Sequence, residues 1–379
     1  MKKIASGLLV ASTLVTIHTA QAKRIAPVDD GSTTIEVALL LDTSNSMDGL
    51  IEQAKSRLWN IVNTLTTLKY NGKTPTIKIA LYEYGNNGLS QKDNWVRQAM
   101  PLTQDLDSIS EKLFALRTNG GNEYVGAAIT DASAQLKWSG ARNSMKLIYV
   151  AGNESFKQGS VDYREAISDA RSKDIYINAI YCGDAAQGIN EFWNDGVQLG
   201  GGQYFSIDSD KKIQYIETPY DEKISQLNGK LNNTYYGYGR SGSTSKLKQS
   251  NQDENAAALA PSVSVDRAVT KSKNSAYSNS DWDVVDRYKK DKNFISQADD
   301  SALPAELKGK SEREKVAFIE AKTAERESIQ TEIGKLAVQR QDYIDAQAKL
   351  SQGADDLGAA IEKSIFKIAE KKGFSQANR

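Results

Sequence analysis

The chain has 379 residues, and its 48 lysine or arginine and 48 aspartate or glutamate residues give a formal net charge of zero. That balance gives no reason to expect nucleic acid as a partner, and the length allows one large core plus a second module. The single histidine, His18, lies in a segment predicted to be cleaved off. The mature chain would then have no Ser-His-Asp or Cys-His nucleophilic site and no histidine-ligated zinc.

The N-terminus has the features of a bacterial secretory signal peptide. Lys2 and Lys3 precede an apolar stretch over 4–17, and Ala20-Gln21-Ala22 is a small-x-small cleavage sequence. We therefore predict cleavage after Ala22 and a periplasmic or secreted mature protein. The apolar stretch is short for a membrane anchor, which is the alternative, and we expect no transmembrane segment in the mature chain.

An apolar strand over 35–41 ends in a D-x-S-x-S motif, Asp42-Thr43-Ser44-Asn45-Ser46, and a helix is predicted from about Leu50. One carboxylate and two hydroxyls at alternate positions place three hard oxygens on one rim. Such oxygens favour Mg²⁺, Mn²⁺ or Ca²⁺ over Zn²⁺. Asp42, Ser44 and Ser46 are therefore candidate metal ligands. The alternatives are that Asp42 caps the following helix, or that the serine hydroxyls bond their own backbone.

Apolar runs alternate with amphipathic helical patterns from about residue 30 to residue 236. The apolar runs are 35–41, 77–82, 147–150, 175–182 and 204–207, and Trp95 to Leu102 predicts a further strand that a short hairpin would make antiparallel. This alternation predicts an α/β fold, with a doubly wound, mostly parallel sheet and helices on both faces. Such sheets bind ligands at the carboxyl ends of their strands, where the D-x-S-x-S motif lies.

This combination resembles the von Willebrand factor type A domain with its metal-ion-dependent adhesion site. The resemblance covers about residues 30–236 and rests on three features. They are the D-x-S-x-S motif after the first strand, Gly120-Gly121 before the third helix, and a polar tetrad after the fourth strand. It implies a Rossmann-like fold, a divalent cation as cofactor, and a binding protein rather than an enzyme.

The resemblance also implies metal ligands on two further loops. In Gly120-Gly121-Asn122-Glu123, Glu123 takes the carboxylate place found in one bacterial branch of the family, where the commoner residue is threonine. In Ala151-Gly152-Asn153-Glu154, Asn153 falls where the family usually has aspartate, and Glu154 is the alternative ligand. Both loops depart from the usual pattern. Glu123 would also suit the N-terminus of the next helix electrostatically, so that alternative stays open.

The sequence changes character after Tyr236. Residues 237–300 are predicted to be a linker with weak helical segments, and residues 301–379 a helical C-terminal module. Thr323 and Arg326 interrupt the apolar face of the long helical pattern, so a continuous coiled coil is not secure. A last amphipathic helix carries apolar residues from Leu357 to Ile368 and is predicted to pack against the helix over 311–350.

These observations lead to one hypothesis and two alternatives. We hypothesise an exported protein that binds a protein ligand, in adhesion or envelope complex assembly. The ligand's carboxylate would meet a divalent cation, Mg²⁺ or else Mn²⁺ or Ca²⁺. By resemblance, Glu123 and Asn153 or Glu154 would complete the metal site. The alternatives are a Mg²⁺-dependent hydrolase using the same carboxylates, although the chain has no P-loop or G-x-S-x-G motif, and a structural envelope protein with a degenerate metal site.

Overall fold

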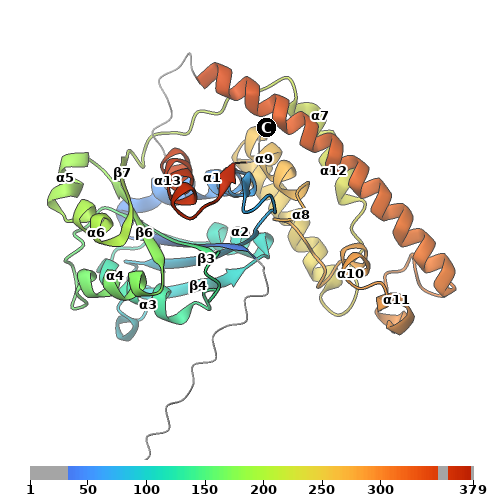
Figure 1. Cartoon of the computed structure of the whole chain (residues 1–379), viewed down its shortest axis with the longest axis horizontal. Helices are drawn as coiled ribbons and strands as arrows, with labels where there is room; N and C mark the ends of the chain where they lie inside the picture. Colours follow the sequence, from blue (N-terminus) through green and yellow to red (C-terminus); the bar gives the residue numbers. More distant parts are fainter. Residues whose placement is uncertain (1–32, 349–356, 377–379) are drawn as a thin grey trace, which may run out of the picture.

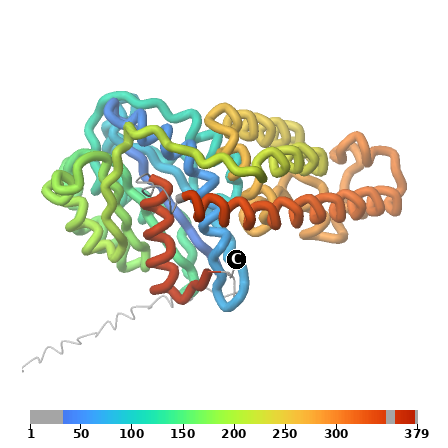
Figure 2. The backbone as a smooth tube through the Cα atoms, turned by 90° about the horizontal axis from the view of Figure 1, so that it is seen from above, coloured from blue at the N-terminus to red at the C-terminus, as the bar shows by residue number. Residues whose placement is uncertain are grey.

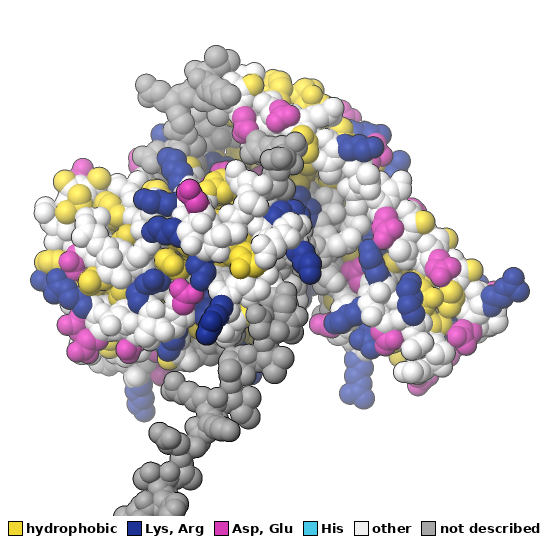
Figure 3. Space-filling view, in the orientation of Figure 1, with side chains coloured by type: hydrophobic (Ala, Val, Ile, Leu, Met, Phe, Trp, Pro, Cys, Tyr) yellow, Lys and Arg dark blue, Asp and Glu magenta, His cyan; other side chains and the backbone are white. Residues whose placement is uncertain are grey.

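The structure, a computed structural model, describes residues 33–348 and 357–376. The predicted signal peptide, residues 1–22, lies outside the described residues. Among the helices that are described, none is both long and apolar enough to cross a membrane. Basic and acidic side chains are interspersed over the face of the molecule seen in Figure 3, as the balanced composition leads one to expect.

A six-stranded sheet forms the centre of the larger lobe (Figure 1), with the strand order β4-β3-β1-β5-β6-β7. Neighbouring strands are parallel, except that β3 and β4 are antiparallel. The strands are β1 Thr34–Asp42, β3 Thr76–Tyr84, β4 Val96–Thr103, β5 Met145–Gly152, β6 Ile175–Cys182 and β7 Gly201–Ile207. The predicted mostly parallel α/β sheet is confirmed, including the antiparallel strand after Trp95.

Helices cover both faces of this sheet, as predicted. One face carries α3, α4 and α6, and the other carries α1, α2 and α13. Their bounds are α1 Asp48–Thr66, α2 Leu106–Ala115, α3 Val125–Gln135, α4 Tyr163–Ser172, α6 Trp193–Gly200 and α13 Leu357–Lys371, and a short α5 Ala185–Asn190 precedes α6. The near-continuous apolar strands are explained by this double cover, because both sides of each central strand face a helix layer.

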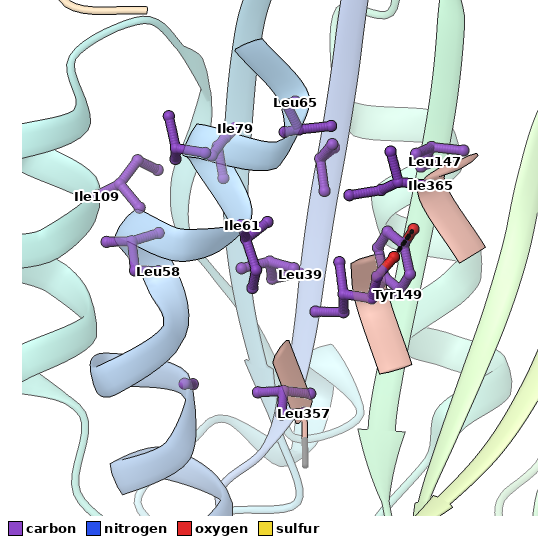
Figure 4. Packing of buried hydrophobic residues seen from close by; sticks show 14 of the residues in the cluster. Leu39, Leu58, Ile61, Leu65, Ile79, Ile109, Leu147, Tyr149, Leu357 and Ile365 are labelled. Atoms are coloured by element: carbon purple, nitrogen blue, oxygen red, sulfur yellow. Dashed lines mark hydrogen bonds between the residues drawn. The ribbon is translucent and has the colours of Figure 1, made fainter. Parts of the chain in front are cut away.

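The last helix of the chain completes the core of the sheet. Figure 4 shows Leu357 and Ile365 of α13 among side chains of α1, β1 and β5, and Ile365 is fully buried. The hydroxyl groups of Tyr149 and Ser364 share a hydrogen bond there. The main contacts of α13 are therefore with α1 and the sheet, not with the long helix that the sequence indicated as its partner. The reason is that this stretch of the sheet would otherwise expose apolar side chains to water.

Between the sheet and α13 the chain forms a helical arm, which extends away from the sheet in Figure 2. The arm contains α7 Asp221–Asn232, α8 Gly242–Leu259, α9 Pro261–Lys271, α10 Val284–Lys290, α11 Phe294–Gln297 and α12 Glu312–Ala348. The segment predicted as a linker thus holds α8 to α11, which pack against one another and against α1, α2, α7 or α12. The boundaries proposed at residues 236 and 300 stay a prediction.

Buried arginines explain the polar interruption in the apolar face of α12. Arg326 and Arg340 are 3% and 5% exposed, and each guanidinium group is paired with two carboxylates. The pairs are Arg326 with Asp283 and Asp286, at 2.7 Å each, and Arg340 with Asp221 at 2.9 Å and Asp266 at 2.6 Å. Buried charges are tolerated when they are paired and hydrogen-bonded, so these contacts attach α12 to the rest of the arm.

A third buried arginine joins the arm to the sheet lobe. Arg267 of α9 pairs with Asp107 of α2 at 2.7 Å and with Asp253 of α8, and Lys271 pairs with Asp253 at 2.9 Å. Burial alone would raise the pKa of Asp253, but the charges of Lys271 and Arg267 hold it well below its usual range. Two cations and two carboxylates thus balance one another in a buried junction.

We predict that Ile365→Ala lowers the free energy of unfolding by about 3 kcal/mol, because it leaves a cavity in the sheet core under α13. Urea unfolding of the full-length mature chain measures this. Val338→Ala is the control, since Val338 lies on α12 with 43% of its surface exposed, and it should change stability by less than about 0.5 kcal/mol. Equal, small effects of the two substitutions would contradict the placement of α13 in the core.

We predict that the stability contributed by Asp253 depends on pH. Its pKa is lower in the folded than in the unfolded chain, so the contribution is complete above about pH 4 and is lost as the pH falls further. Asp253→Asn should therefore cost about 3 kcal/mol at neutral pH, and the difference from wild type should shrink in acid. The exposed neighbour Glu254 supplies the control variant, Glu254→Gln. Urea unfolding across a pH series measures both, and a difference that stays constant down to about pH 2 would argue against the junction.

Candidate functional site

The carboxyl ends of three adjacent strands meet at one edge of the sheet. Asp42 ends β1, Tyr84 ends β3 and Gly152 ends β5, and in the parallel register Asp42 lies opposite Tyr84 while Leu41 lies opposite Ala151. The loops that follow these strands therefore start at the same level. This is the edge at which open parallel sheets bind ligands.

Hydrogen bonds connect the D-x-S-x-S loop to the loop after β5. The backbone N–H of Ser44 donates to Asp42 Oδ1 at 2.7 Å, and the hydroxyl oxygens of Ser44 and Ser46 lie 3.3 Å apart. Asn153 Nδ2 donates to Ser46 Oγ at 3.1 Å. Asp42 does not cap α1, whose N-cap position is Met47, so the capping alternative is wrong for this residue. Its contact with Ser44 is instead a turn within the motif.

Glu123 faces Asp42 across Gly85. A Cβ atom placed on Gly85 would lie 2.7 Å from Glu123 Cγ and 2.8 Å from Asp42 Oδ1, so both side chains lie against the same glycine. Burial raises the pKa of Glu123 far above its usual range, and the neighbouring Asp42 carboxylate raises it further. Burial also raises the pKa of Asp42. Two buried carboxyl groups without a cation favour keeping a proton on one of them.

Glu154 lies on the rim of the same edge, further out than Asn153. Its side chain is exposed, while its backbone carbonyl accepts a hydrogen bond from the indole N–H of Trp193 at 2.7 Å. The Glu154 charge is close enough to add to the raised pKa values of Asp42 and Glu123. The structure thus brings all six sequence-predicted residues to one edge, with Asn153 in hydrogen-bond contact with the motif and Glu154 outside it.

Three buried oxygen atoms of these residues have no hydrogen-bond partner in the described structure. They are Asp42 Oδ2, Glu123 Oε2 and Asn153 Oδ1, and each comes from a different loop. Buried acceptors are normally satisfied, so three unsatisfied oxygens at one edge fit a hard cation such as Mg²⁺. Across the described ranges, no cluster of three or more His, Cys, Asp and Glu side chains is arranged to hold a metal. A cation here would therefore also use hydroxyl and amide oxygens.

Sequence reasoning missed three residues that shape this edge, namely Tyr84, Gly85 and Gly152. Tyr84 donates from its hydroxyl to the carbonyl of Ala151 at 3.0 Å, and Gly85 follows it with φ +80°. A Cβ atom on Gly152 would lie 2.4 Å from Tyr84 Oη and 2.9 Å from Asp42 Oδ2. Only glycine permits these close approaches. The signal in the sequence is a glycine directly after β3 and another at the end of β5.

Asparagine contacts hold the glycine-rich loop against the motif. Asn119 N donates to the carbonyl of Thr43 at 2.9 Å, and Asn87 N donates to the carbonyl of Gly120 at 2.8 Å. Asn86 Nδ2 donates to the carbonyl of Arg117 at 2.7 Å. The loop that carries Glu123 is thus fixed to the loops after β1 and β3, which keeps its carboxyl group near Asp42.

Residues 36–219 match the family model described as the von Willebrand factor type A domain. This region is a von Willebrand factor type A domain. The match contains the D-x-S-x-S motif and both loops discussed above. No curated protein matches the chain.

The solved structures that match part of this chain share little sequence with it. The conserved hypothetical protein BatB from Bacteroides thetaiotaomicron is 18% identical over 46% of this chain and 90% of its own, with a TM-score of 0.35. The SpRpn10 VWA domain is 16% identical over 45% of this chain and 87% of its own, also with a TM-score of 0.35. Proximal thread matrix protein 1 from the mussel byssus, described with a zinc-occupied MIDAS motif, is 14% identical over 48% of this chain and 43% of its own, with a TM-score of 0.34.

We predict that Glu123→Gln removes a pH dependence of the metal-free protein. The pKa of Glu123 is higher in the folded than in the unfolded chain, so the folded state binds more protons and loses stability as the pH rises. With EDTA present, wild type should lose stability between about pH 5 and about pH 8, and Glu123→Gln should lose less. Melting temperatures measured across that range test this, and parallel curves for the two proteins would place Glu123 in water, away from Asp42.

Proposed function

We propose that the von Willebrand factor type A domain of this protein binds a protein ligand through a divalent cation and is not an enzyme. The observation that carries the proposal is the set of unsatisfied buried oxygens on Asp42, Glu123 and Asn153. The resemblance to the family favours a binding module. The mature chain would also have no histidine to act as a general base.

The proposed metal ligands are Asp42, Ser44, Ser46, Glu123 and Asn153, with Glu154 as the alternative to Asn153. Carboxylate, hydroxyl and amide oxygens are the donors that Mg²⁺, Mn²⁺ and Ca²⁺ prefer, and we propose Mg²⁺ as the ion. When bound, the cation would offer an open position to a carboxylate of the partner. Hydrogen bonds from Ser44 N and Asn153 Nδ2 hold the Asp42 carboxylate and the Ser46 hydroxyl in place.

The charge of Glu123 would set the balance between holding the ion and holding the partner. Asp42 supplies one negative charge and ionised Glu123 would supply a second, whereas Asn153 is neutral where the family usually has aspartate. Two carboxylates would roughly neutralise a divalent ion, which favours ion binding and weakens attraction for an outside carboxylate. One carboxylate would leave the ion more electrophilic. Glu123 is thus the residue through which this site differs from the commoner threonine form.

We further propose that the protein is exported and works in the periplasm or outside the cell, in adhesion or in assembly of an envelope complex. The support is the N-terminal pattern of Lys2, Lys3, an apolar stretch and Ala20-Gln21-Ala22. The interspersed surface charge gives no support for a nucleic-acid partner. The arm would then be a second surface available to partners, next to the metal-binding domain.

We predict that Mg²⁺ or Mn²⁺ raises the melting temperature of the mature protein, because an ion that binds the folded state stabilises it by mass action. Asp42→Ala should abolish this response, since it removes the only carboxylate of the motif. Asp210→Ala serves as the control, because Asp210 is an exposed acid near the start of α1 and outside the proposed ligand set. Thermal unfolding with EDTA, Mg²⁺ and Mn²⁺ measures the effect. Identical metal responses of wild type and Asp42→Ala would refute the site.

A further inference from the structure

A cleft lies between the sheet lobe and the helical arm, away from the edge that carries the candidate metal site. Four helices labelled in Figure 1 line it, namely α1, α9, α12 and α13, and its volume is about 160 Å³. The metal site lies at the N-terminus of α1, whereas the cleft lies along residues 60–67, at the other end of that helix. A space of this size holds a group as large as a benzene ring.

Part of the cleft wall is apolar and leaves room for an occupant. The apolar side chains are those of Val269, Ala337, Val338 and Phe366, and the ring of Phe366 is only partly covered by the core. Gly334 lines the same cleft as the single glycine of α12, and a Cβ atom there would meet no atom within 4 Å. Glycine weakens a helix interior compared with alanine. Since no close contact requires glycine here, its effect is to leave the cleft free of a side chain.

A lysine without an acidic partner lines the same cleft. Lys273 is partly buried, and its Nζ donates a hydrogen bond to Thr66 Oγ1 at 2.8 Å. Among the described residues it forms no ion pair, whereas the neighbouring buried Lys271 is paired with Asp253. Burial lowers the pKa of Lys273 to about 8, although the charge of Asp266 opposes this shift. A cation in such surroundings is stabilised when an anion binds beside it.

The acidic residues that line the cleft are engaged elsewhere. Asp266 is paired with Arg340 at 2.6 Å, and Glu362 also has an interaction of its own. The side-chain amide of Asn60, by contrast, forms no hydrogen bond with the described residues. The cleft therefore offers an anion one cation without an acidic partner and one amide donor, beside an apolar wall.

We propose that this cleft binds a small organic carboxylate, with its carboxylate group at Lys273 and its apolar group against Val269 and Phe366. A carboxylate supplies the missing negative charge, and a compact apolar group fills the space beside Gly334. Because the cleft is lined by helices of both the arm and the sheet lobe, the occupant contacts both parts of the protein. This site is separate from the metal site and does not depend on the proposed function.

The test measures binding of benzoate to the full-length mature protein by isothermal titration calorimetry. Metal is first removed by dialysis against EDTA and then against plain buffer, so that no cation at the metal site can bind the carboxylate. Benzamide has the same shape without the charge, and acetate has the charge without the ring. We expect saturable benzoate binding with a Kd of about 1 mM or tighter, and binding about tenfold or more weaker for benzamide and for acetate.

Two substitutions change different properties of the cleft. Lys273→Met removes the charge but keeps a long side chain, so it should weaken benzoate binding about tenfold or more. Gly334→Leu fills the open space and should abolish binding without lowering the melting temperature, because leucine favours a helix interior over glycine. The control is Lys335→Met, at an exposed lysine of α12 outside the cleft, which should bind benzoate like wild type.

Absence of saturable benzoate binding by wild type, or equal binding of benzoate and benzamide, would overturn the proposed carboxylate site. Benzoate binding that is unchanged in both Lys273→Met and Gly334→Leu would place the ligand elsewhere on the protein and would overturn it as well. None of these outcomes bears on the proposed function, because the calorimetry is done without metal and the function is tested by the metal response of Asp42→Ala.

Discussion

The position of β1 in the middle of the sheet determines both the core and the candidate site. All nine of its residues are buried, and it pairs in parallel with β3 on one side and β5 on the other. That register brings three strand ends to one level and places Asp42, fully buried, at the last position of β1. A buried carboxylate must be compensated by hydrogen bonds or by a cation. The sheet that stabilises the domain thus also buries the Asp42 carboxylate, and the surrounding loops supply hydrogen bonds to only one of its two oxygens.

Buried ion pairs stabilise the helical arm, and one of them, at Arg267, also joins the arm to α2. Apolar contacts between α9 and α1 contribute to the same attachment. Arg267, Arg326 and Arg340 are buried, and each is paired with two aspartates, so the charges at these junctions compensate one another. Removing one member of such a set leaves an unpaired buried charge, which makes the junctions sensitive to substitution. The chain then returns to the sheet with α13, whose apolar face covers α1, β5 and β6. In sequence, the arm is therefore inserted between two parts of one core.

The local patterns in the sequence were sufficient for the sheet and insufficient for the arm. The strands follow from continuous apolar runs, and the D-x-S-x-S motif follows from its place at the end of the first run, since both are local properties. The docking of α13 is not local. The amphipathic face at Ile361 and Ile365 shows that this helix packs on an apolar surface. Both the long helix α12 and the sheet offered such a surface, and periodicity does not choose between them. Arg326 looked like an interruption because its partners, Asp283 and Asp286, lie some forty residues away in sequence.

Local sequence patterns were also insufficient for part of the candidate site, where contacts between distant loops decide the geometry. The six candidate ligands could be named from the motif and the resemblance. Gly85 and Gly152 could not, because their role is to let the backbone lie close to neighbouring side chains, and the sequence does not show which side chains those are. Elsewhere the described chain pairs its most deeply buried arginines fully. At this edge it leaves one buried oxygen each of Asp42, Glu123 and Asn153 without a partner. Buried polar atoms elsewhere, such as Asn178 Nδ2 and Ser262 Oγ, are also unpaired, but here three oxygens come from loops that converge. Unsatisfied acceptors destabilise the free protein, and a bound cation would offset that cost. The convergence of three such oxygens, rather than the lack of a partner alone, distinguishes this edge.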